Sequence, residues 1–212
     1  MRIGILGTGN MADALGTQWV RAGHRVLFAG RSPDRARALA DRTGGVAGTF
    51  EEAVSFGAAV LLALPYAAAL DTLTALGAEE GALRDRVLID CTNAVGPGFV
   101  LTTGDGPGAA RTLADTTGAR VVKAFNHLPD PVWRLTPPAF ADGPVAVPLC
   151  GDDEEALETV AALVRDLGCV PMVVGGLDRA AYLEATTAFL IGLWHCGHDP
   201  RTLLPPFEAA TA

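Results

Sequence analysis

The sequence predicts a doubly wound α/β fold built on a mostly parallel sheet. Short apolar segments alternate with segments of helical character along almost the whole chain, as in a succession of βαβ units. Residues 58–64 are apolar at every position, which is typical of a central strand covered by helices on both faces. The chain of 212 residues is 50% hydrophobic, which is enough for one compact core without disulfide or metal staples.

The alternation predicts each element in order. Strands are expected at residues 2–6, 25–29, 45–48, 58–64, 87–91, 121–125, 145–149 and 169–174. Helices are expected at residues 10–22, 51–56, 66–76, 153–167 and 180–194, and a further helix begins after Ser32-Pro33. The glycine-rich residues 96–108 are predicted to form a loop. We expect residues 1–124 to form the main domain and residues 125–212 a small C-terminal α/β extension that continues the same unit.

Charge and cysteine usage argue against several classes of partner. The net charge of −8 disfavours nucleic acids and anionic membranes. No apolar stretch approaches the roughly 20 residues that span a bilayer, and we expect no secretory signal. The four cysteines are scattered without metal-ligand spacing. We therefore expect no metal site, and reduced thiols in a cytoplasmic protein.

A glycine loop joins the first strand to the first helix. Gly7-Thr8-Gly9-Asn10-Met11-Ala12 follows the pattern G-x-G-x-x-A, and the second strand ends at the spacing that a dinucleotide-binding βαβ unit requires. Gly7 permits a tight turn, and Gly9 lets backbone N–H groups approach a pyrophosphate at the helix N-terminus. The sequence thus predicts a Rossmann fold that binds a dinucleotide, against the alternative of a glycine turn without a nucleotide.

The tip of the second strand predicts which dinucleotide binds. Enzymes that use NAD place a carboxylate there to bind the ribose 2′-hydroxyl, whereas this chain has Gly30-Arg31-Ser32 followed by Arg35. Two guanidinium groups and a hydroxyl can bind a 2′-phosphate through charge-assisted hydrogen bonds. Residues 1–45 also carry seven arginines against three aspartates. We therefore predict NADP(H), with solvated surface charges as the alternative for Arg31 and Arg35.

Further candidate residues follow the carboxyl ends of the central strands, where ligands of such sheets bind. Leu64, Pro65 and Tyr66 come after residues 58–63 and are candidates to line the cofactor. Packing of Tyr66 against the next helix is an equal alternative. Asn93 follows residues 87–91 on the same rim and is a further cofactor-binding candidate.

The loop after residues 121–125 supplies the substrate-binding candidates. They are Asn126, His127, Leu128 and Pro129. His127 is the candidate catalytic residue, because an imidazole can donate a proton to a reduced substrate. A role as a hydrogen-bonding wall residue is the alternative.

Four stretches carry a resemblance to the NADP-dependent oxidoreductases of the deazaflavin coenzyme F-420 type. They are GILGTGNMADAL, GRSPDRA, VVKAFNHLPDPVW, and VPLCGDDEEALETVAALVRDLGCVPMVVGGL with YLEATTAFLIGL. The resemblance implies that Thr8 to Met11 hold the pyrophosphate and that Arg31, Ser32 and Arg35 hold the 2′-phosphate. It also implies that Asn126 to Pro129 approach the nicotinamide and the electron acceptor, and that the protein is a homodimer.

The chain departs from this family around the acceptor. His127 stands where family members commonly have a small hydroxyl residue, the expected proline after Asn93 is absent, and residues 100–108 are unusually rich in glycine. We therefore expect hydride transfer between NADP(H) and a deazaflavin acceptor, with coenzyme F-420 as co-substrate. One alternative is an NADPH-dependent reductase of a small organic imine or carbonyl. The other is an NADP(H)-sensing protein without turnover.

Overall fold

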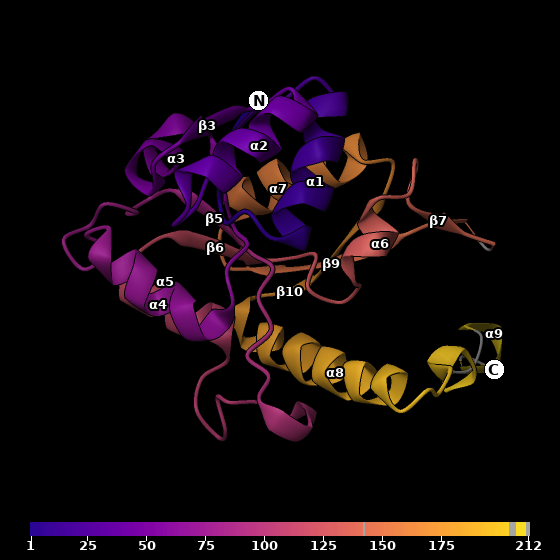
Figure 1. The fold of residues 1–212 in the computed structure, drawn as a ribbon. Coiled ribbons are helices and arrows are strands. Elements are labelled where there is room, and N and C mark those ends of the chain that lie inside the picture. Colours follow the sequence, from indigo (N-terminus) through magenta and orange to yellow (C-terminus); the bar gives the residue numbers. More distant parts are fainter. Residues whose placement is uncertain (142, 204–206, 211–212) are drawn as a thin grey trace.

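The computed structural model describes residues 1–141, 143–203 and 207–210, and its centre is an eight-stranded sheet (Figure 1). The strand order is β10-β9-β6-β5-β4-β1-β2-β3, and neighbouring strands run parallel except β6 and β9. The chain proceeds from β1 outward to β2 and β3, then returns to β4 on the other side of β1. This reversal of direction opens a crevice at the carboxyl ends of β1 and β4, where ligands of doubly wound sheets bind.

All eight predicted strands are present, so the predicted fold class is confirmed. The strands of the sheet are β1 (Arg2–Leu6), β2 (Arg25–Ala29), β3 (Val46–Gly48), β4 (Ala59–Leu62), β5 (Val87–Asp90), β6 (Arg120–Lys123), β9 (Ala146–Gly151) and β10 (Val170–Gly175). The helices are α1 (Asn10–Arg21), α2 (Pro33–Thr43), α3 (Phe50–Phe56), α4 (Tyr66–Ala75), α5 (Ala109–Thr117), α6 (Asp130–Trp133), α7 (Glu154–Asp166), α8 (Leu177–His195) and α9 (Phe207–Ala210). The remaining elements are the short helices η1 (Pro97–Phe99) and η2 (Pro200–Thr202), and the two-stranded sheet of β7 (Ala139–Phe140) and β8 (Gly143–Pro144).

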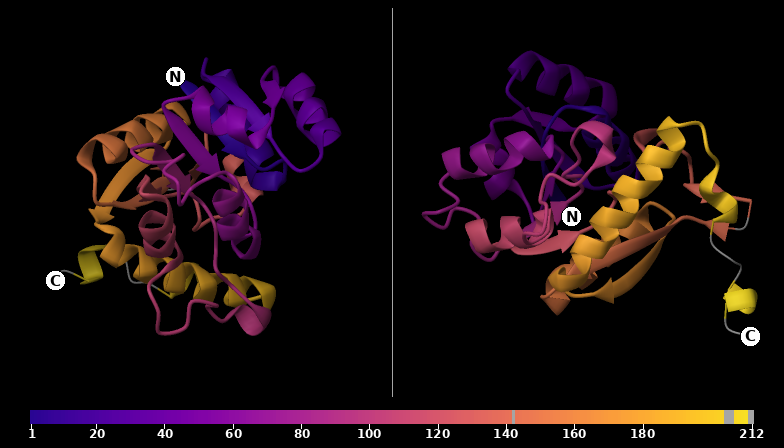
Figure 2. Two further views of the ribbon diagram at one scale, coloured as in Figure 1. Left: turned by 90° about the vertical axis from the view of Figure 1, so that its left-hand side faces the viewer. Right: turned by 90° about the horizontal axis from the view of Figure 1, so that it is seen from below.

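Helices cover both faces of the sheet, which is why the central strands are apolar throughout. Helices α1, α2 and α7 pack on one face, where Trp19 and Phe28 are fully buried. Helices α3, α4 and α5 and the first turns of α8 pack on the other face, around Leu73 and Leu113. Figures 1 and 2 show α8 leaving the sheet near β10 and running along the outside of the molecule. None of the described helices combines the length and apolarity needed to cross a bilayer.

Local side-chain hydrogen bonds explain where two of the helices begin. Ser32 caps α2 as its sequence predicts, because its Oγ accepts from the Arg35 N–H at 3.4 Å. Asp153 caps α7, with its Oδ1 2.7 Å from the Ala156 nitrogen. The neighbouring Asp152 instead accepts from the Leu177 N–H at the start of α8, at 2.8 Å.

Three features differ from the sequence expectations. Residues 109–117 form α5, which periodicity did not predict, and the last long helix begins at Leu177 rather than at residue 180. The C-terminal strands also change direction, because β9 pairs antiparallel with β6 through Val122 and Lys123. The sheet therefore continues past residue 124 without a break, but with its last two strands reversed.

Candidate functional site

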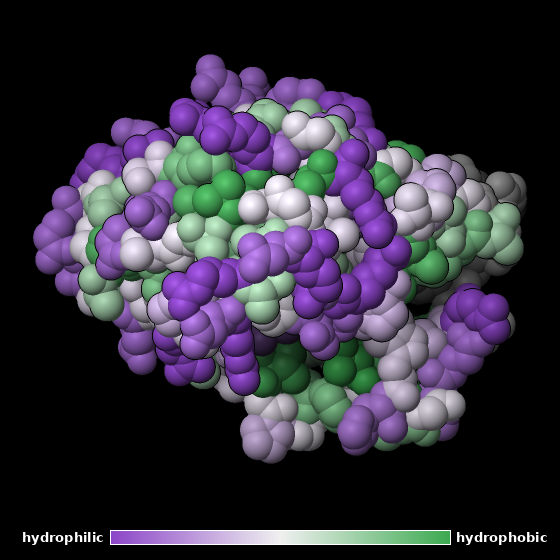
Figure 3. Space-filling view, turned by 45° about the horizontal axis from the view of Figure 1, so that its top comes forward, coloured by the Kyte–Doolittle hydropathy of each residue, from purple (hydrophilic) through white to green (hydrophobic). Residues whose placement is uncertain are grey.

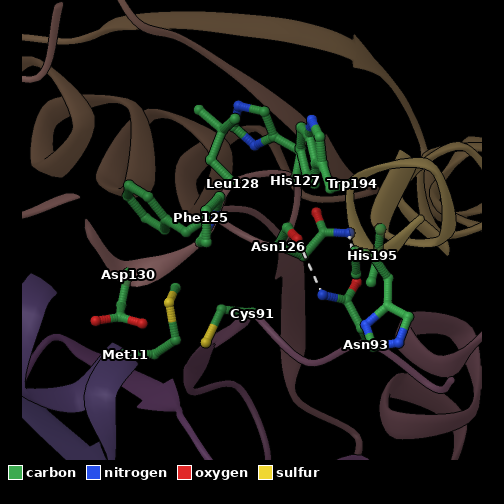
Figure 4. Close-up of a pocket in the computed structure, with 12 residues that line it drawn as sticks. Met11, Cys91, Asn93, Phe125, Asn126, His127, Leu128, Asp130, Trp194 and His195 are labelled. Atoms are coloured by element: carbon green, nitrogen blue, oxygen red, sulfur yellow. Dashed lines mark hydrogen bonds between the residues drawn. The ribbon is translucent and has the colours of Figure 1, made fainter. Parts of the chain in front are cut away.

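A cavity of about 530 Å³ lies at the carboxyl edge of the sheet (Figure 4). Its size is typical of sites that bind small molecules. The strand ends form its floor, the loop after β6 one wall, and the last turns of α8 another. The lining residues are Met11, Cys91, Asn93, Phe125, Asn126, His127, Leu128, Pro129, Asp130, Ile191, Trp194 and His195. Figure 3 shows one face of the molecule, largely hydrophilic, with hydrophobic side chains in a hollow near the lower edge.

The glycine loop adjoins this cavity at Met11 in the first turn of α1. Gly7 has φ +137° and its N–H donates to the Ala29 carbonyl at 2.8 Å. A Cβ at this position would lie 2.2 Å from the Ala63 oxygen, so only glycine fits. Gly9 caps α1 without a side-chain hydrogen bond, and a Cβ there would meet nothing within 4 Å. The loop therefore offers open backbone N–H groups at a helix N-terminus, which fits a pyrophosphate.

The tip of β2 carries unpaired positive charge. Arg31 and Arg35 are exposed, and neither forms an ion pair with any carboxylate in the described part of the chain. By contrast, Arg37 on the same helix pairs with Asp34. Ser32 holds its Oγ against the start of α2. A hollow of about 320 Å³ lies beside this tip, lined by Gly30, Pro33, Ala36, Arg37, Ala47, Gly48, Thr49 and Glu52.

Two asparagines hold the floor of the cavity together. Asn93 Nδ2 donates to the Asn126 carbonyl at 2.9 Å, and Asn126 Nδ2 donates to Asn93 Oδ1 at 3.1 Å (Figure 4). Asn126 Nδ2 also reaches Thr187 Oγ1 on α8 at 3.2 Å. Phe125 precedes this pair with φ +62°, a conformation that non-glycine residues rarely adopt. Asn126 Oδ1 is buried without a hydrogen-bond partner among the described residues, so this acceptor is available to a ligand.

His127 forms a neutral part of the wall. Its Nε2 lies 3.1 Å from the Ala146 carbonyl oxygen, which requires the proton on Nε2. The ring packs edge-on against Trp133, with centroids 5.5 Å apart. Burial lowers the pKa of His127 to about 4, despite the opposing hydrogen bond to Ala146. In this geometry the one N–H of His127 is already donated to the backbone. The wall role is therefore favoured over the proton-donor role.

A buried ionic cluster lies behind the cavity, and the sequence did not predict it. Lys123 Nζ is 2.9 Å from Asp90 Oδ2 and 3.1 Å from Glu184 Oε1, and all three side chains are at most 1% exposed. Burial alone would lower the pKa of Lys123, but the attraction of the two carboxylates outweighs it and raises that pKa. Glu184 also accepts the first two N–H groups of α5, at 2.8 and 3.1 Å. The cluster thus joins β5, β6, α5 and α8.

The predicted site residues fall into three groups. Those that line the cavity are Met11, Asn93, Asn126, His127, Leu128 and Pro129. Those of the phosphate-binding loop and of the tip of β2 are Gly7, Thr8, Gly9, Asn10, Arg31, Ser32 and Arg35. Leu64, Pro65 and Tyr66 follow β4 and do not line the cavity. The Tyr66 hydroxyl faces Thr112 of α5 and burial raises its pKa, which matches the alternative of helix packing.

Sequence reasoning missed six residues that line the cavity. They are Cys91, Phe125, Asp130, Ile191, Trp194 and His195. Asp130 lies beside the predicted loop and could have been included with it. The three residues of α8 carry no local signal, because only the tertiary fold returns this helix to the carboxyl edge. Among the described residues, no group of three His, Cys, Asp or Glu side chains could hold a metal ion.

Solved structures with similar folds agree with this architecture. A protein from Arthrobacter sp. FB24, described as a candidate F420-dependent NADP-reductase, superposes with a TM-score of 0.81 at 23% identity, covering 92% of this chain and 95% of that one. A hypothetical protein from Sinorhizobium meliloti superposes with a TM-score of 0.74 at 27% identity, covering 85% and 88%. An imine reductase from Pseudomonas sp. superposes with a TM-score of 0.69 at 18% identity, covering 92% of this chain and 63% of that one.

Sequence comparisons agree with the resemblance. The chain is 30% identical over 194 residues to the metalloreductase STEAP3 of Rattus norvegicus, which is 91% of this chain. It spans 38% of the length of that protein. Residues 2–94 match the family model for NADP oxidoreductases, coenzyme F420-dependent. The matched segment runs from β1 to the loop after β5 and contains the glycine loop and the tip of β2.

Proposed function

We propose that this protein binds NADP(H) along the carboxyl edge of the sheet and transfers a hydride between its nicotinamide and a deazaflavin-type acceptor. The observation that carries the proposal is the cavity of about 530 Å³ that meets the glycine loop at Met11. A dinucleotide whose pyrophosphate lies on this loop has one end near the tip of β2 and its nicotinamide in the cavity. We place the second ring in the part of the cavity that Ile191, Trp194 and His195 of α8 line.

The chemistry of the lining residues supports hydride transfer. Bound NADPH supplies a hydride from its nicotinamide ring, and the acceptor ring takes this hydride together with a proton from solvent. The protein's part in such a reaction is to hold and orient two rings in contact, for which apolar walls such as Phe125, Leu128 and Ile191 are suited. Asn126 Oδ1, buried and unpartnered, can accept a hydrogen bond from a ring substituent.

The residues give less support to a reductase that must protonate an organic imine or carbonyl. His127 is neutral and its N–H is committed to Ala146. Burial raises the pKa of the Cys91 thiol to about 12, so this thiol is a poor proton donor. That alternative remains the second candidate, since the same cavity would hold a small imine beside a nicotinamide.

The test is a coupled titration and turnover measurement. NADPH binding is followed by its fluorescence, and oxidised coenzyme F-420 is then added while the deazaflavin absorbance band is monitored. Bleaching of the band in step with NADPH oxidation supports the proposal. NADPH binding without bleaching between pH 5.5 and 8.5 overturns it. Oxidation of NADPH by a cyclic imine under the same conditions favours the second candidate instead.

We further propose that residues 1–124 and 125–212 form one structural unit and that the protein is a cytoplasmic homodimer. Residues 1–124 and 125–212 both line the cavity. All four cysteines are free thiols, as in a reducing compartment. Large apolar side chains stay exposed on β10 and α8, among them Met172, Val173, Tyr182 and Phe189. Such exposure is typical of an interface, and the molar mass from light scattering tests for a second copy.

A further inference from the structure

We propose that the buried ion pair of Lys123 and Glu184 positions helix α8, so that the last turns of this helix form the wall of the cavity. Neither residue lines the cavity, so both act through the helix and not on a bound molecule. This role rests on the proposed function, in which a nicotinamide and an acceptor ring share the cavity. The position of the wall then sets how far apart the two rings lie.

Helix α8 is anchored to the rest of the protein by its earlier turns. Its buried residues are Leu177, Ala180, Glu184, Thr187 and Ala188. Ile191, Trp194 and His195 line the cavity from the turns beyond the last of these, where no residue of this fully described helix is buried. The wall therefore takes its position from the anchored turns.

A surface loop touches the same last turns but is a weaker support than the sheet. The Phe99 ring of η1 lies 4.9 Å from the ring of His195. Phe99 is itself only half-buried, and Gly98 and Val100 on either side of it are exposed. Since surface loops are more mobile than the strands of a core, the sheet gives the firmer reference for the position of α8.

Two of the buried residues of α8 make directional contacts. Glu184 Oε1 lies 3.1 Å from Lys123 Nζ, and Thr187 Oγ1 accepts from Asn126 Nδ2 at 3.2 Å. The apolar residues beside them contribute packing, but the hydrophobic effect has no preferred direction. A charge-assisted hydrogen bond is short and specific in its geometry. The ion pair therefore fixes the register and rotation of the helix more narrowly than apolar packing does.

Lys123 is held in turn by the strand ends that carry the floor of the cavity. Its Nζ donates to Asp90 Oδ2 at 2.9 Å and to the Thr92 carbonyl at 2.7 Å. With the Glu184 carboxylate, these acceptors use all three N–H groups of the ammonium. Asn126 of the floor follows Lys123 by three residues, and Thr92 directly precedes the other floor asparagine. One ammonium group thus ties the floor of the cavity to the helix that forms its wall.

The cost of burying charge indicates that the cluster serves geometry. Replacing a buried ion pair by apolar side chains of similar volume is often neutral or stabilising, so stability alone does not account for three buried charged groups. In some proteins, buried polar groups instead select one arrangement among several that pack about equally well. The present cluster lies where such a selection affects the site, between the floor and the wall of the cavity.

The distance between the cluster and the wall amplifies small changes. Trp194 follows Glu184 by ten residues, which is about 15 Å along a helix. A tilt of roughly 5° about Glu184 would therefore move Trp194 by about 1.3 Å. Misplacement of reacting groups by about 1 Å can lower a rate on the order of 100-fold. Loss of the ion pair should thus affect hydride transfer more than the binding of either ring.

The test compares two isosteric variants of the cluster. Glu184→Gln and Asp90→Asn each replace a carboxylate bonded to Lys123 by an amide of the same size. Only Glu184 belongs to α8, and the amide oxygen of Asp90→Asn can still accept from the Thr92 N–H, which Asp90 Oδ1 does at 2.8 Å. Leu163→Ala, at a fully buried position of α7, is the control for lost stability alone.

Binding and chemistry are measured separately for each variant that gives a cooperative urea transition. The measurements are the dissociation constant of NADPH, that of oxidised coenzyme F-420 on NADP⁺-saturated protein by deazaflavin fluorescence, and the single-turnover rate of hydride transfer. In Glu184→Gln the rate should fall about 10- to 100-fold. The F-420 dissociation constant should rise about threefold to tenfold, while that of NADPH should change less than about twofold, because its phosphates bind at the other end of the site. Asp90→Asn and Leu163→Ala should change each quantity by less than about threefold.

Two results overturn the positioning role. One is an unchanged rate in Glu184→Gln. The other is an equal loss in Asp90→Asn or Leu163→Ala, which would show an effect of stability alone. Should Glu184→Gln not fold, Glu184→Asp replaces it, because aspartate keeps the charge but withdraws the carboxylate by one methylene group. The same contrast with Asp90→Asn is then expected, and its absence overturns the role.

Hydrogen exchange in the ligand-free proteins separates this role from the proposed function. Loss of the anchor in Glu184→Gln should speed exchange of the amides of residues 188–195 about tenfold and leave α1 unchanged, whereas Asp90→Asn should show neither effect. This pattern supports the positioning role even if coenzyme F-420 takes no hydride, a result that overturns the proposed function alone. Unchanged exchange at residues 188–195 overturns the positioning role even if the wild-type protein turns over.

Discussion

Replacement of Arg31 and Arg35 by alanine should convert a protein that prefers NADPH into one that no longer distinguishes it from NADH. Both guanidinium groups are exposed and unpaired in the described chain, so neither substitution breaks an ion pair. A hydrogen bond to a charged group contributes about 1.5–3 kcal/mol. Each single variant should therefore bind NADPH about 10- to 150-fold more weakly. The double variant should lose less than the product of these factors, because both side chains act on one phosphate.

The assay is a fluorescence titration of NADPH and NADH against each variant at fixed salt. NADH lacks the 2′-phosphate, so its dissociation constant should change little. Arg21→Ala is the matched control, since it removes the same charge from an exposed position in the last turn of α1, at the opposite edge of the sheet. Equal losses for the two cofactors would refute the assignment of this tip as a 2′-phosphate site. An equal loss in Arg21→Ala would indicate a general effect of net charge.

Three further predictions concern stability and reactivity. Lys123→Met should lower the free energy of unfolding by about 3–5 kcal/mol, because it leaves Asp90 and Glu184 buried without a cation. In the same urea titration, the control Arg165→Ala removes an exposed pair with Glu158 and should leave the midpoint nearly unchanged. Burial lowers the pKa of His127 from its usual 6.5 to about 4, so the unfolded state binds more protons between these two pH values. The free energy of unfolding should therefore fall by about 1.5 kcal/mol from pH 6.5 to pH 5, and an equal fall in His127→Gln would contradict this. Burial raises the pKa of Cys91 to about 12 and those of Cys150 and Cys169 to about 11. Iodoacetamide at pH 8 should therefore label only the exposed Cys196 of the native protein, as read by mass spectrometry. Labelling of Cys91 would show that the cavity opens.

The parts that sequence reasoning predicted well are those with local causes. Residues 2–6 and 25–29 form strands with the predicted bounds, because their apolar character needs no distant partner to be recognised. Ser32 and Pro33 begin α2 as expected, since the cap bond closes within three residues. Gly7 occupies a conformation and a space that exclude a side chain.

Helix α5 was missed because its start is determined from elsewhere in the chain. Gly108 caps it without a side-chain hydrogen bond, so the local sequence carries no start signal. Its first two N–H groups are instead satisfied by Glu184 of α8, 75 and 74 residues later in the chain. The reversal of β9 has a similar origin, because strand direction depends on pairing with β6 and not on local periodicity.

The sequence by itself therefore determined the βαβ unit and, through Arg31, Ser32 and Arg35, the prediction of NADP(H). These features rest on backbone conformation and short-range spacing, which a single stretch of chain encodes. Only the tertiary structure decided the shape and charge of the acceptor cavity. Its walls join Met11, the loop after β6 and the end of α8, and the buried contacts of Lys123 and Glu184 hold that helix against the sheet. Long-range packing brings these residues together, and no local sequence pattern indicates this packing.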